Sequence, residues 1–242
     1  MTFKPLIKIF RESFYNLFKN PIIILPSLML YIIFIIISDL SVKINYKLQT
    51  SLSLGIWVIS FSIISLLISS FFLSGLIGMS FQAIKRRTKF RDLFYYSSKF
   101  FFPNLILVFL IIVVYNIIRY VAHNLALLIL KPFNVPLHIA QGVFFLLYFA
   151  GLVGIIIFLT FSNFYLIIKD MTISNAIKNS VSLVKKKYIY VLSIIIIFFI
   201  INELLNLTNI RILYELVNAI FIVPYLSLIL TKFLLTFDKI ER

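Results

Sequence analysis

Six long apolar runs constrain the fold of this chain more than any other feature of its sequence. A helix needs about 20 mostly apolar residues to cross the hydrocarbon core of a bilayer. The runs are continuous, whereas the strands of a membrane barrel alternate apolar and polar residues, so we expect helices throughout. The predicted spans cover residues 21–38, 52–81, 103–123, 137–168, 188–205 and 212–237.

The amino-acid composition fits no soluble class of protein. Of the 242 residues, 62% are hydrophobic and 13% are charged, whereas a soluble domain has roughly 45–50% apolar and about 25% charged residues. The polar side chains are too few to cover a water-soluble globule, and the chain has no cysteine for disulfides or thiolate chemistry. We therefore predict one all-α domain over residues 1–242, a polytopic bundle of six transmembrane helices in the cell membrane.

The basic residues are unevenly distributed between the two sides of the predicted bundle. There are 23 lysines and arginines and only 8 acidic residues, which gives a net charge of +15. Most of the basic residues lie in segments that share one side with both chain ends, here called the basic side. Lysine and arginine collect on the cytoplasmic side of membrane proteins, so we expect both termini in the cytoplasm. The expected partners of this charge are anionic lipid headgroups rather than nucleic acid. The candidate headgroup contacts are Lys85, Arg86, Arg87, Lys185, Lys186 and Lys187.

Three segments of the basic side, 4–19, 88–99 and 173–186, have apolar residues at helical spacing. We interpret them as amphipathic helices at the headgroup boundary, each followed by a hairpin of two spans. The alternative is that they are only the flanks of spans, where basic and aromatic residues collect. The apolar stripes are Ile7, Phe10, Phe14 and Leu17 in the first, Phe90, Leu93 and Phe94 in the second, and Ile173, Ala176, Ile177, Ser180, Val181 and Val184 in the third.

Small residues and prolines within the spans predict how the helices pack. Ser70, Ser74 and Gly78 fall at i, i+4 and i+8, a face that lets another helix approach closely. Pro26 and Pro224 interrupt the first and last spans. Because proline lacks the backbone N–H group, each is expected to kink its helix.

Five polar residues near the opposite side form the outer polar cluster, which is the candidate binding site. Counting about 1.5 Å per residue along each span places Arg119, Glu203 and Glu215 at a similar depth. Asn116, Arg119 and His123 fall at i, i+3 and i+7, on one helical face. An unpaired charge at this depth is costly, so we hypothesise a polar cavity in which Arg119 pairs with Glu203 or Glu215. The alternative is that these charges reach the headgroups or form a structural ion pair.

No motif in the sequence predicts catalysis, a metal site or a cofactor site. The two histidines, His123 and His138, lack the neighbouring ligands that zinc needs. The glycine patterns of nucleotide-binding loops and the GxSxG nucleophile motif are absent. The isolated acids of the basic side, Glu12, Asp92 and Asp170, are expected to form local ion pairs and helix caps. We therefore expect no catalytic residue, no metal and no cofactor.

Residues Ile168–Ile197 read IKDMTISNAIKNSVSLVKKKYIYVLSIIII, an acidic residue followed by Ala-x-x-x-Ser, basic residues and a span. Together with LFKNPIIILP at 17–26 and GLIG at 75–78, this pattern resembles a group of six-span prokaryotic membrane proteins. The group includes the membrane domain attached to some glycerophosphodiester phosphodiesterases. The resemblance implies the six-helix fold. The tryptophan that often follows the serine is Val181 here, so association with an enzyme is not carried over. The matching positions are Asp170, Ala176, Ser180, Lys185, Lys186, Lys187 and Tyr188.

These features favour a function without catalysis. We expect a membrane protein that binds or transports a small or amphiphilic solute, or that organises lipid or protein partners, including further copies of itself. The first alternative is a lipid-modifying enzyme with Glu203, Glu215 and His123 as acid–base groups. The second is a structural subunit of a larger membrane complex.

Overall fold

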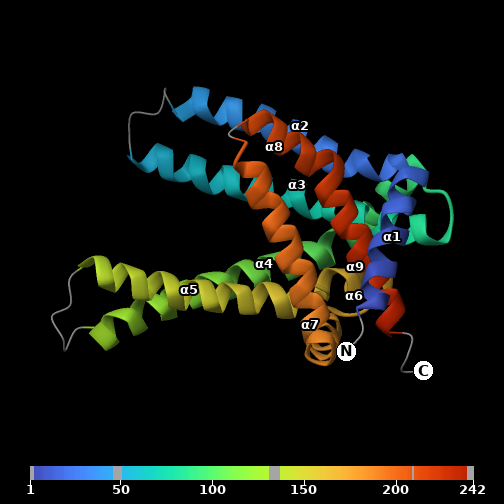
Figure 1. Cartoon of the computed structure of the whole chain (residues 1–242). Coiled ribbons are helices and arrows are strands. Elements are labelled where there is room, and N and C mark those ends of the chain that lie inside the picture. Colours follow the sequence, from blue (N-terminus) through green and yellow to red (C-terminus); the bar gives the residue numbers. More distant parts are fainter. Residues whose placement is uncertain (1–2, 46–50, 131–136, 209, 239–242) are drawn as a thin grey trace.

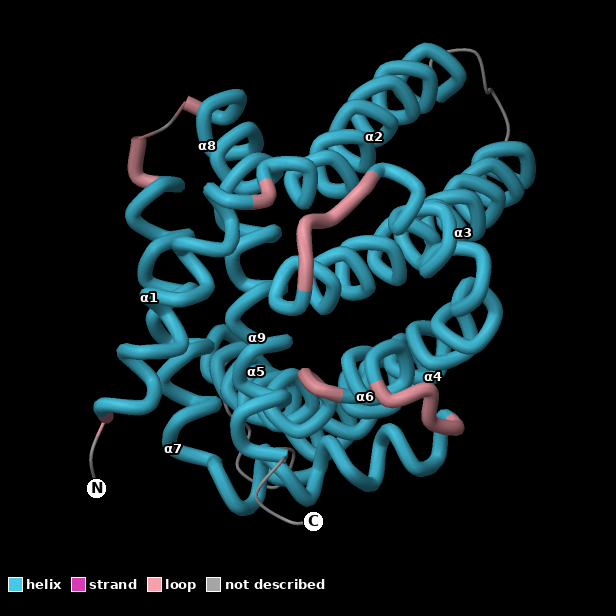
Figure 2. The backbone as a smooth tube through the Cα atoms, turned by 90° about the vertical axis from the view of Figure 1, so that its right-hand side faces the viewer, coloured by secondary structure: helices cyan, strands magenta, loops and turns pink. Residues whose placement is uncertain are grey.

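The computed structural model describes residues 3–45, 51–130, 137–208 and 210–238, and every regular element in these ranges is a helix (Figure 1). This confirms the predicted all-α fold class. Figure 2 shows the backbone as a tube in which short loops join the helices. In chain order the elements are α1 (Lys4–Lys19), the 3-10 helix η1 (Pro21–Ile23), α2 (Ile24–Asn45), α3 (Ser51–Lys85), α4 (Phe90–Leu130), α5 (Leu137–Leu159), α6 (Ser162–Ile168), α7 (Ile173–Asn206), α8 (Arg211–Val217), the π-helical turn η3 (Asn218–Ile222) and α9 (Val223–Phe237).

Six stretches in the described residues are long and apolar enough to cross a membrane, so the chain is a multi-pass membrane protein. Each overlaps one predicted span, and their bounds differ by up to 15 residues. The 41 residues of α4 make a helix of about 60 Å, twice the hydrocarbon thickness of about 30 Å, so part of α4 extends outside the bilayer. The stretches are Pro21–Ile44, Gly55–Lys85, Phe90–Leu128, Gln141–Ile168, Ile173–Asn206 and Ile212–Phe237.

Two antiparallel helix pairs, α2–α3 and α4–α5, diverge from a shared end of the molecule (Figure 1). At that shared end α1, α6 and α9 pack together with them, whereas α8 lies beside α2. The largest core side chains gather at the shared end. Phe161, Tyr165 and Phe233 are at most 2% exposed, and the rings of Phe161 and Phe233 stack with centroids 5.3 Å apart. The hydrophobic core therefore lies at the end of the bundle that carries α1 and the end of α9.

Helices α3 and α4 approach each other closely at the predicted small-residue face. Ser70 and Ser74 are fully buried, and a Cβ atom on Gly78 would overlap the ring of Tyr96 in α4. Asn104 of α4 donates a hydrogen bond from Nδ2 to the Ser70 carbonyl at 3.0 Å. The expectation that this face allows a second helix to approach is confirmed.

The interfacial helix 88–99 is not separate from the span that follows it, because α4 continues unbroken through Pro103. Its buried residues Leu93, Phe100 and Leu107 repeat every seven positions, on one face of the helix. The same apolar stripe holds both parts against the core, so nothing favours a break between them. The helix predicted at 4–19 is present as α1, Lys4–Lys19, whereas its position at the membrane interface stays a prediction.

The fourth predicted span, 137–168, is not one helix, because the chain breaks between α5 and α6. Ser180 of α7 bridges the break. Its hydroxyl donates to the Phe158 carbonyl at 2.7 Å and accepts from the Phe161 N–H at 3.2 Å. Backbone groups inside a membrane protein must find partners within the protein, and Ser180 supplies those that the broken helix lacks.

Local distortions also set the boundaries of the last two spans. Helix α7 is non-helical at Lys187 (φ −123°, ψ 27°), so the predicted interfacial helix 173–186 ends at a kink where the fifth span begins. In the last span the π-helical turn η3 immediately precedes α9, whose second residue is Pro224. Proline removes an N–H donor and clashes with the preceding turn, and the wider π turn accommodates it. Pro26 lies instead in the first turn of α2, where proline is well tolerated.

Candidate functional site

Four of the five residues of the outer polar cluster line two separate clefts, and Glu203 lines neither. The first, here called the Arg119 cleft, lies on the α4–α5 pair and has a volume of about 450 Å³. The second, the Glu215 cleft, lies between α2 and α8 and has a volume of about 690 Å³. The Arg119 cleft is lined by Asn116, Arg119, Tyr120, His123 and Phe144. The polar lining of the Glu215 cleft comprises Tyr31, Ser38, Asp39 and Glu215.

The Arg119 cleft places a cation beside aromatic rings. His123 meets Phe144 of α5 edge to face, with ring centroids 5.8 Å apart. Asn116 directs its Nδ2 donor to the Ile112 carbonyl at 2.9 Å, within α4 itself. Arg119 is exposed, and none of the ion pairs found among the described residues involves it. The cleft therefore offers an uncompensated guanidinium group in a mainly apolar and aromatic setting.

The hypothesised ion pair of Arg119 with a glutamate is not formed in the described structure. Glu203 is exposed on α7, and Glu215 is half-buried in the cleft beside α2. Glu215 lines a cleft with residues of α2, whereas Arg119 lines one with Phe144 of α5. The α2–α3 and α4–α5 pairs diverge (Figure 1). The sequence indicates depth along each span but not the lateral distance between helices. A binding role for the outer polar cluster stays a prediction.

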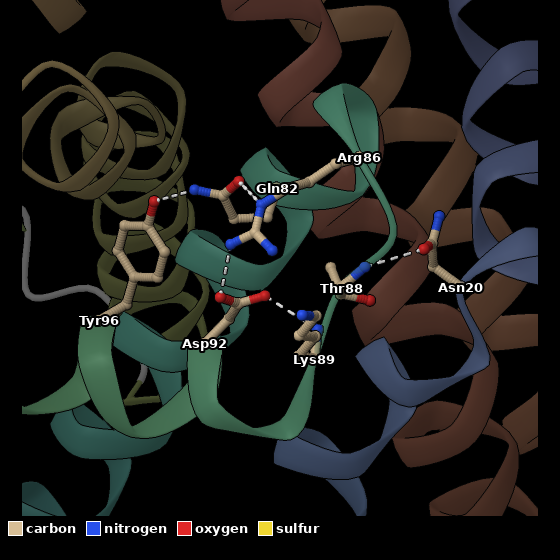
Figure 3. A network of polar contacts seen from close by, with 7 residues as sticks. All are labelled: Asn20, Gln82, Arg86, Thr88, Lys89, Asp92 and Tyr96. Carbon is tan, nitrogen blue, oxygen red and sulfur yellow. Dashed lines mark hydrogen bonds and ion pairs between the residues drawn. The ribbon is translucent and has the colours of Figure 1, made fainter.

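On the basic side, Asn20 and Asp92 hold three chain segments together (Figure 3). Asn20, which follows α1, accepts a hydrogen bond from the Thr88 N–H at 3.1 Å. Asp92 accepts from the Arg86 guanidinium at 2.8 Å and from the Lys89 N–H at 2.8 Å. Since Lys89 immediately precedes α4, the second bond caps that helix. Arg86, a predicted headgroup contact, thus has part of its charge neutralised within the protein.

The acidic residues that the structure describes on the basic side all form ion pairs. The predicted ion pairing of Glu12, Asp92 and Asp170 is confirmed, but it is local in sequence only for Asp92 with Arg86 and Glu12 with Lys8, because Asp170 pairs with Lys99 of α4. The hydrogen bond from Lys232 lowers the pKa of the Glu12 carboxyl below its ordinary value of 4.5. Besides Arg86–Asp92, the pairs are Glu12–Lys232 at 2.8 Å, Glu12–Lys8 at 3.9 Å, Asp170–Lys99 at 2.6 Å and Asp238–Lys169 at 2.6 Å.

A third cavity, here called the lysine cavity, has a volume of about 710 Å³ and lies between α3, α6 and α9 on the basic side. Its charged lining residues are Lys85, Lys169 and Lys232. Sequence reasoning selected only Lys85. Lys169 and Lys232 were missed because each is one basic residue among many near the end of a span, and only the fold brings them together.

The other predicted headgroup residues lie on the surface of the basic side. Arg87, Lys185 and Lys186 are exposed, and Lys187 is half-buried. The Lys187 ammonium group lies 5.0 Å from the ring centroid of Phe237. Positive charge next to aromatic rings is typical of the membrane interface. Contact of these residues with lipid stays a prediction.

The described residues contain no group of three or more histidine, aspartate or glutamate side chains placed to hold a metal ion. Comparison of the chain with models of protein families, with curated proteins and with solved structures found no match. The resemblance of residues Ile168–Ile197 to the six-span group therefore stays a prediction.

Proposed function

We propose that this chain is a non-enzymatic membrane protein that binds an amphiphilic solute with an anionic group at the Arg119 cleft. Both of its ends would lie in the cytoplasm. The observation that carries the proposal is the state of Arg119, a cation in an apolar and aromatic cleft with no ion pair among the described residues. An anionic ligand would supply the missing counter-charge.

The walls of the Arg119 cleft suit the apolar part of such a solute. Ligand sites are mostly apolar and contain a few polar groups that fix orientation. Here Tyr120 and Phe144 supply aromatic surface, while Asn116 and His123 lie next to Arg119. Arginine binds phosphate and carboxylate groups through two parallel hydrogen bonds, so either anion suits this position.

The two alternative functions have less support. Acid–base catalysis requires groups within hydrogen-bond reach of the same reacting atoms, but His123 and Glu215 line different clefts. A structural subunit would use small-residue faces for its partners, yet the face at Ser74 and Gly78 is occupied by α4 of the same chain. Binding is the function that this geometry favours.

A titration of the purified protein in neutral detergent tests the proposal. We expect dodecyl phosphate to raise the melting temperature more than the zwitterionic dodecylphosphocholine does. Charged hydrogen bonds contribute about 1.5–3 kcal/mol, so Arg119→Ala is expected to weaken the apparent affinity for dodecyl phosphate at least tenfold. Arg119→Lys keeps the charge but loses the two-pronged geometry, and an intermediate loss is expected.

Arg91→Ala is the matched control, because Arg91 is also an exposed arginine of α4 but lies on the basic side. The affinity of the Arg91→Ala variant for dodecyl phosphate is expected to stay within twofold of the affinity of the unchanged protein. An equal loss in both alanine variants would mean unspecific attraction of an anion to a basic protein. That result, or unchanged binding in Arg119→Ala, would overturn the proposal.

A further inference from the structure

The lysine cavity lies where three helices end on the basic side. Lys85 is the last residue of α3, Ile168 is the last residue of α6, and Lys232 lies near the end of α9. The volume of about 710 Å³ falls within the range of ligand pockets, roughly 300–1,000 Å³. Its apolar wall comes from Phe81, Ile84, Ile168 and Leu235, beside the hydroxyl residue Thr236.

The charge that this cavity presents is positive. Lys169 pairs with Asp238 and Lys232 pairs with Glu12, but neither acidic residue is part of the cavity lining. Both lysines still have N–H donors available, because an ammonium group carries three.

Lys85 is the least compensated cation of the three. None of the ion pairs found among the described residues involves it, and its Nζ atom lies 4.0 Å from the ring centroid of Phe81. That cation–π contact holds the ammonium group against the apolar wall. One part of the cavity therefore combines a cation with apolar surface.

We propose that the lysine cavity binds the phosphate headgroup of one anionic phospholipid. The three lysines provide donors for the phosphate, and the wall formed by Phe81, Ile84 and Leu235 provides surface for the glycerol and the start of an acyl chain. Basic pockets between spans on the cytoplasmic side are suited to anionic headgroups. This site is distinct from the diffuse attraction of lipid to the exposed Lys185 and Lys186.

A lipid suits this cavity better than free phosphate does. A free anion would use the lysines only and would leave the apolar wall in contact with water. A lipid already lies in the bilayer into which α3 and α9 extend, so it covers the wall and needs no capture from solution. The alternative role of the lysines is to offset the partial negative charge at the C-terminal ends of the helices.

The ion pair of Lys232 gives the site a second property that can be tested. A phosphate that binds Lys232 competes with the Glu12 carboxylate of α1 for the same ammonium group. Removal of the Glu12 charge should therefore strengthen headgroup binding, whereas removal of the Lys85 charge should weaken it. A purely structural role of these residues gives no such opposite pair of effects.

The experiment is a titration of the full-length protein in neutral detergent with short-chain phosphatidylglycerol, followed by native mass spectrometry. Phosphatidylcholine of the same chain length, which is zwitterionic with no net charge, is the comparison lipid, and glycerol 3-phosphate tests the headgroup without chains. A lysine near an anionic lipid surface contributes about 1 kcal/mol, so Lys85→Ala should weaken phosphatidylglycerol binding about fivefold. Glu12→Gln should tighten it severalfold, and Lys185→Ala, an exposed lysine outside the cavity, should leave it within twofold.

Each other outcome contradicts the proposal in a distinguishable way. Equal losses in Lys85→Ala and Lys185→Ala would mean diffuse attraction without a site. Binding of glycerol 3-phosphate as tight as that of phosphatidylglycerol would assign the cavity to a free anion. A loss in Arg119→Ala with none in Lys85→Ala would place the lipid at the Arg119 cleft. Unchanged binding in both lysine variants would mean that the lysines only offset the partial negative charge at the C-terminal ends of the helices.

Discussion

Glu12 and Lys232 join helices from the two ends of the sequence, α1 and α9, through an ion pair of 2.8 Å. The hydrogen bond from Lys232 lowers the pKa of Glu12, so the folded protein binds fewer protons than the unfolded chain between the two pKa values. The pair therefore contributes stability above the ordinary value of 4.5, and this contribution is lost as the pH falls through the lower folded value. The Glu12 side chain is 34% exposed, so the contribution is under about 1 kcal/mol.

This linkage predicts a pH-dependent difference between the unchanged protein and Glu12→Gln. At pH 7 the unchanged protein should have the higher melting temperature, by a few degrees at most. The difference should shrink as the pH falls below 4.5 and vanish below the folded pKa, because both proteins then carry a neutral side chain. Circular dichroism in detergent measures it. A difference that stays constant over pH 3–7 would show that the charge of Glu12 does not stabilise the fold.

At the same scale, the sequence indicates charge pairing better than hydrogen-bond capping. Glu12, Asp92 and Asp170 are isolated acids among many basic residues, so pairing follows from composition alone. Ser180 is different. It lies in an apolar stripe of the sequence, and burial there was predictable, but its role is to bond two backbone groups of another helix. No local sequence pattern shows which backbone groups of a distant helix lack a hydrogen-bond partner that a serine could supply.

The close packing of α4 against α3 requires glycine, which has no side chain, at two positions of α3. A Cβ atom on Gly75 would lie 2.6 Å from the Ser97 hydroxyl, and one on Gly78 would overlap the Tyr96 ring. Gly78→Ala therefore forces the helices apart, at a cost of about 1–3 kcal/mol for an overpacked interface. We expect a clearly lower melting temperature in detergent for this variant.

Gly154→Ala provides the control for this prediction. Gly154 also lies inside a helix, α5, but a Cβ atom there would meet no atom within 4 Å. Alanine favours a helix over glycine by about 1 kcal/mol, so this variant should be as stable as the unchanged protein or more so. Equal destabilisation by both substitutions would mean that helix propensity rather than close packing governs these positions.

The elements themselves show where sequence patterns succeed and where they fail. Apolar runs locate the six spans because their length is imposed by the membrane. The end of the interfacial helix at 186 was also predictable, since the lysine run precedes a new apolar stretch. The break between α5 and α6 was not, because residues 137–168 are uniformly apolar and a serine of α7 stabilises the interruption.

At the scale of the whole molecule, the fold brings residues of the basic side together that are far apart in the sequence. On the opposite side it separates residues that the sequence places at a similar depth. Ion pairs connect α1 to α9 and α4 to the loop between α6 and α7, and the lysine cavity is lined by residues of α3, α6 and α9 together with Lys169. Four residues of the outer polar cluster are divided between a cleft on the α4–α5 pair and a cleft beside α2, and the α2–α3 and α4–α5 pairs diverge (Figure 1). The lateral position of each helix depends on how all the helices pack together, and the sequence of a single span does not determine it. The two proposed anion sites consequently lie toward opposite faces of the membrane.

The orientation of the whole molecule is testable because the chain has no cysteine, so a single introduced cysteine is the only thiol of this chain. Lys178→Cys marks the basic side and Asn206→Cys marks the opposite side, and both positions are exposed. With the basic residues in the cytoplasm, a membrane-impermeant maleimide should label Asn206→Cys in intact cells and label Lys178→Cys only after permeabilisation. The unmodified chain is the control for background labelling. Labelling of both cysteines in intact cells, or of Lys178→Cys alone, would contradict this orientation. Either result would place the lysine cavity away from the cytoplasmic leaflet, where anionic lipids concentrate.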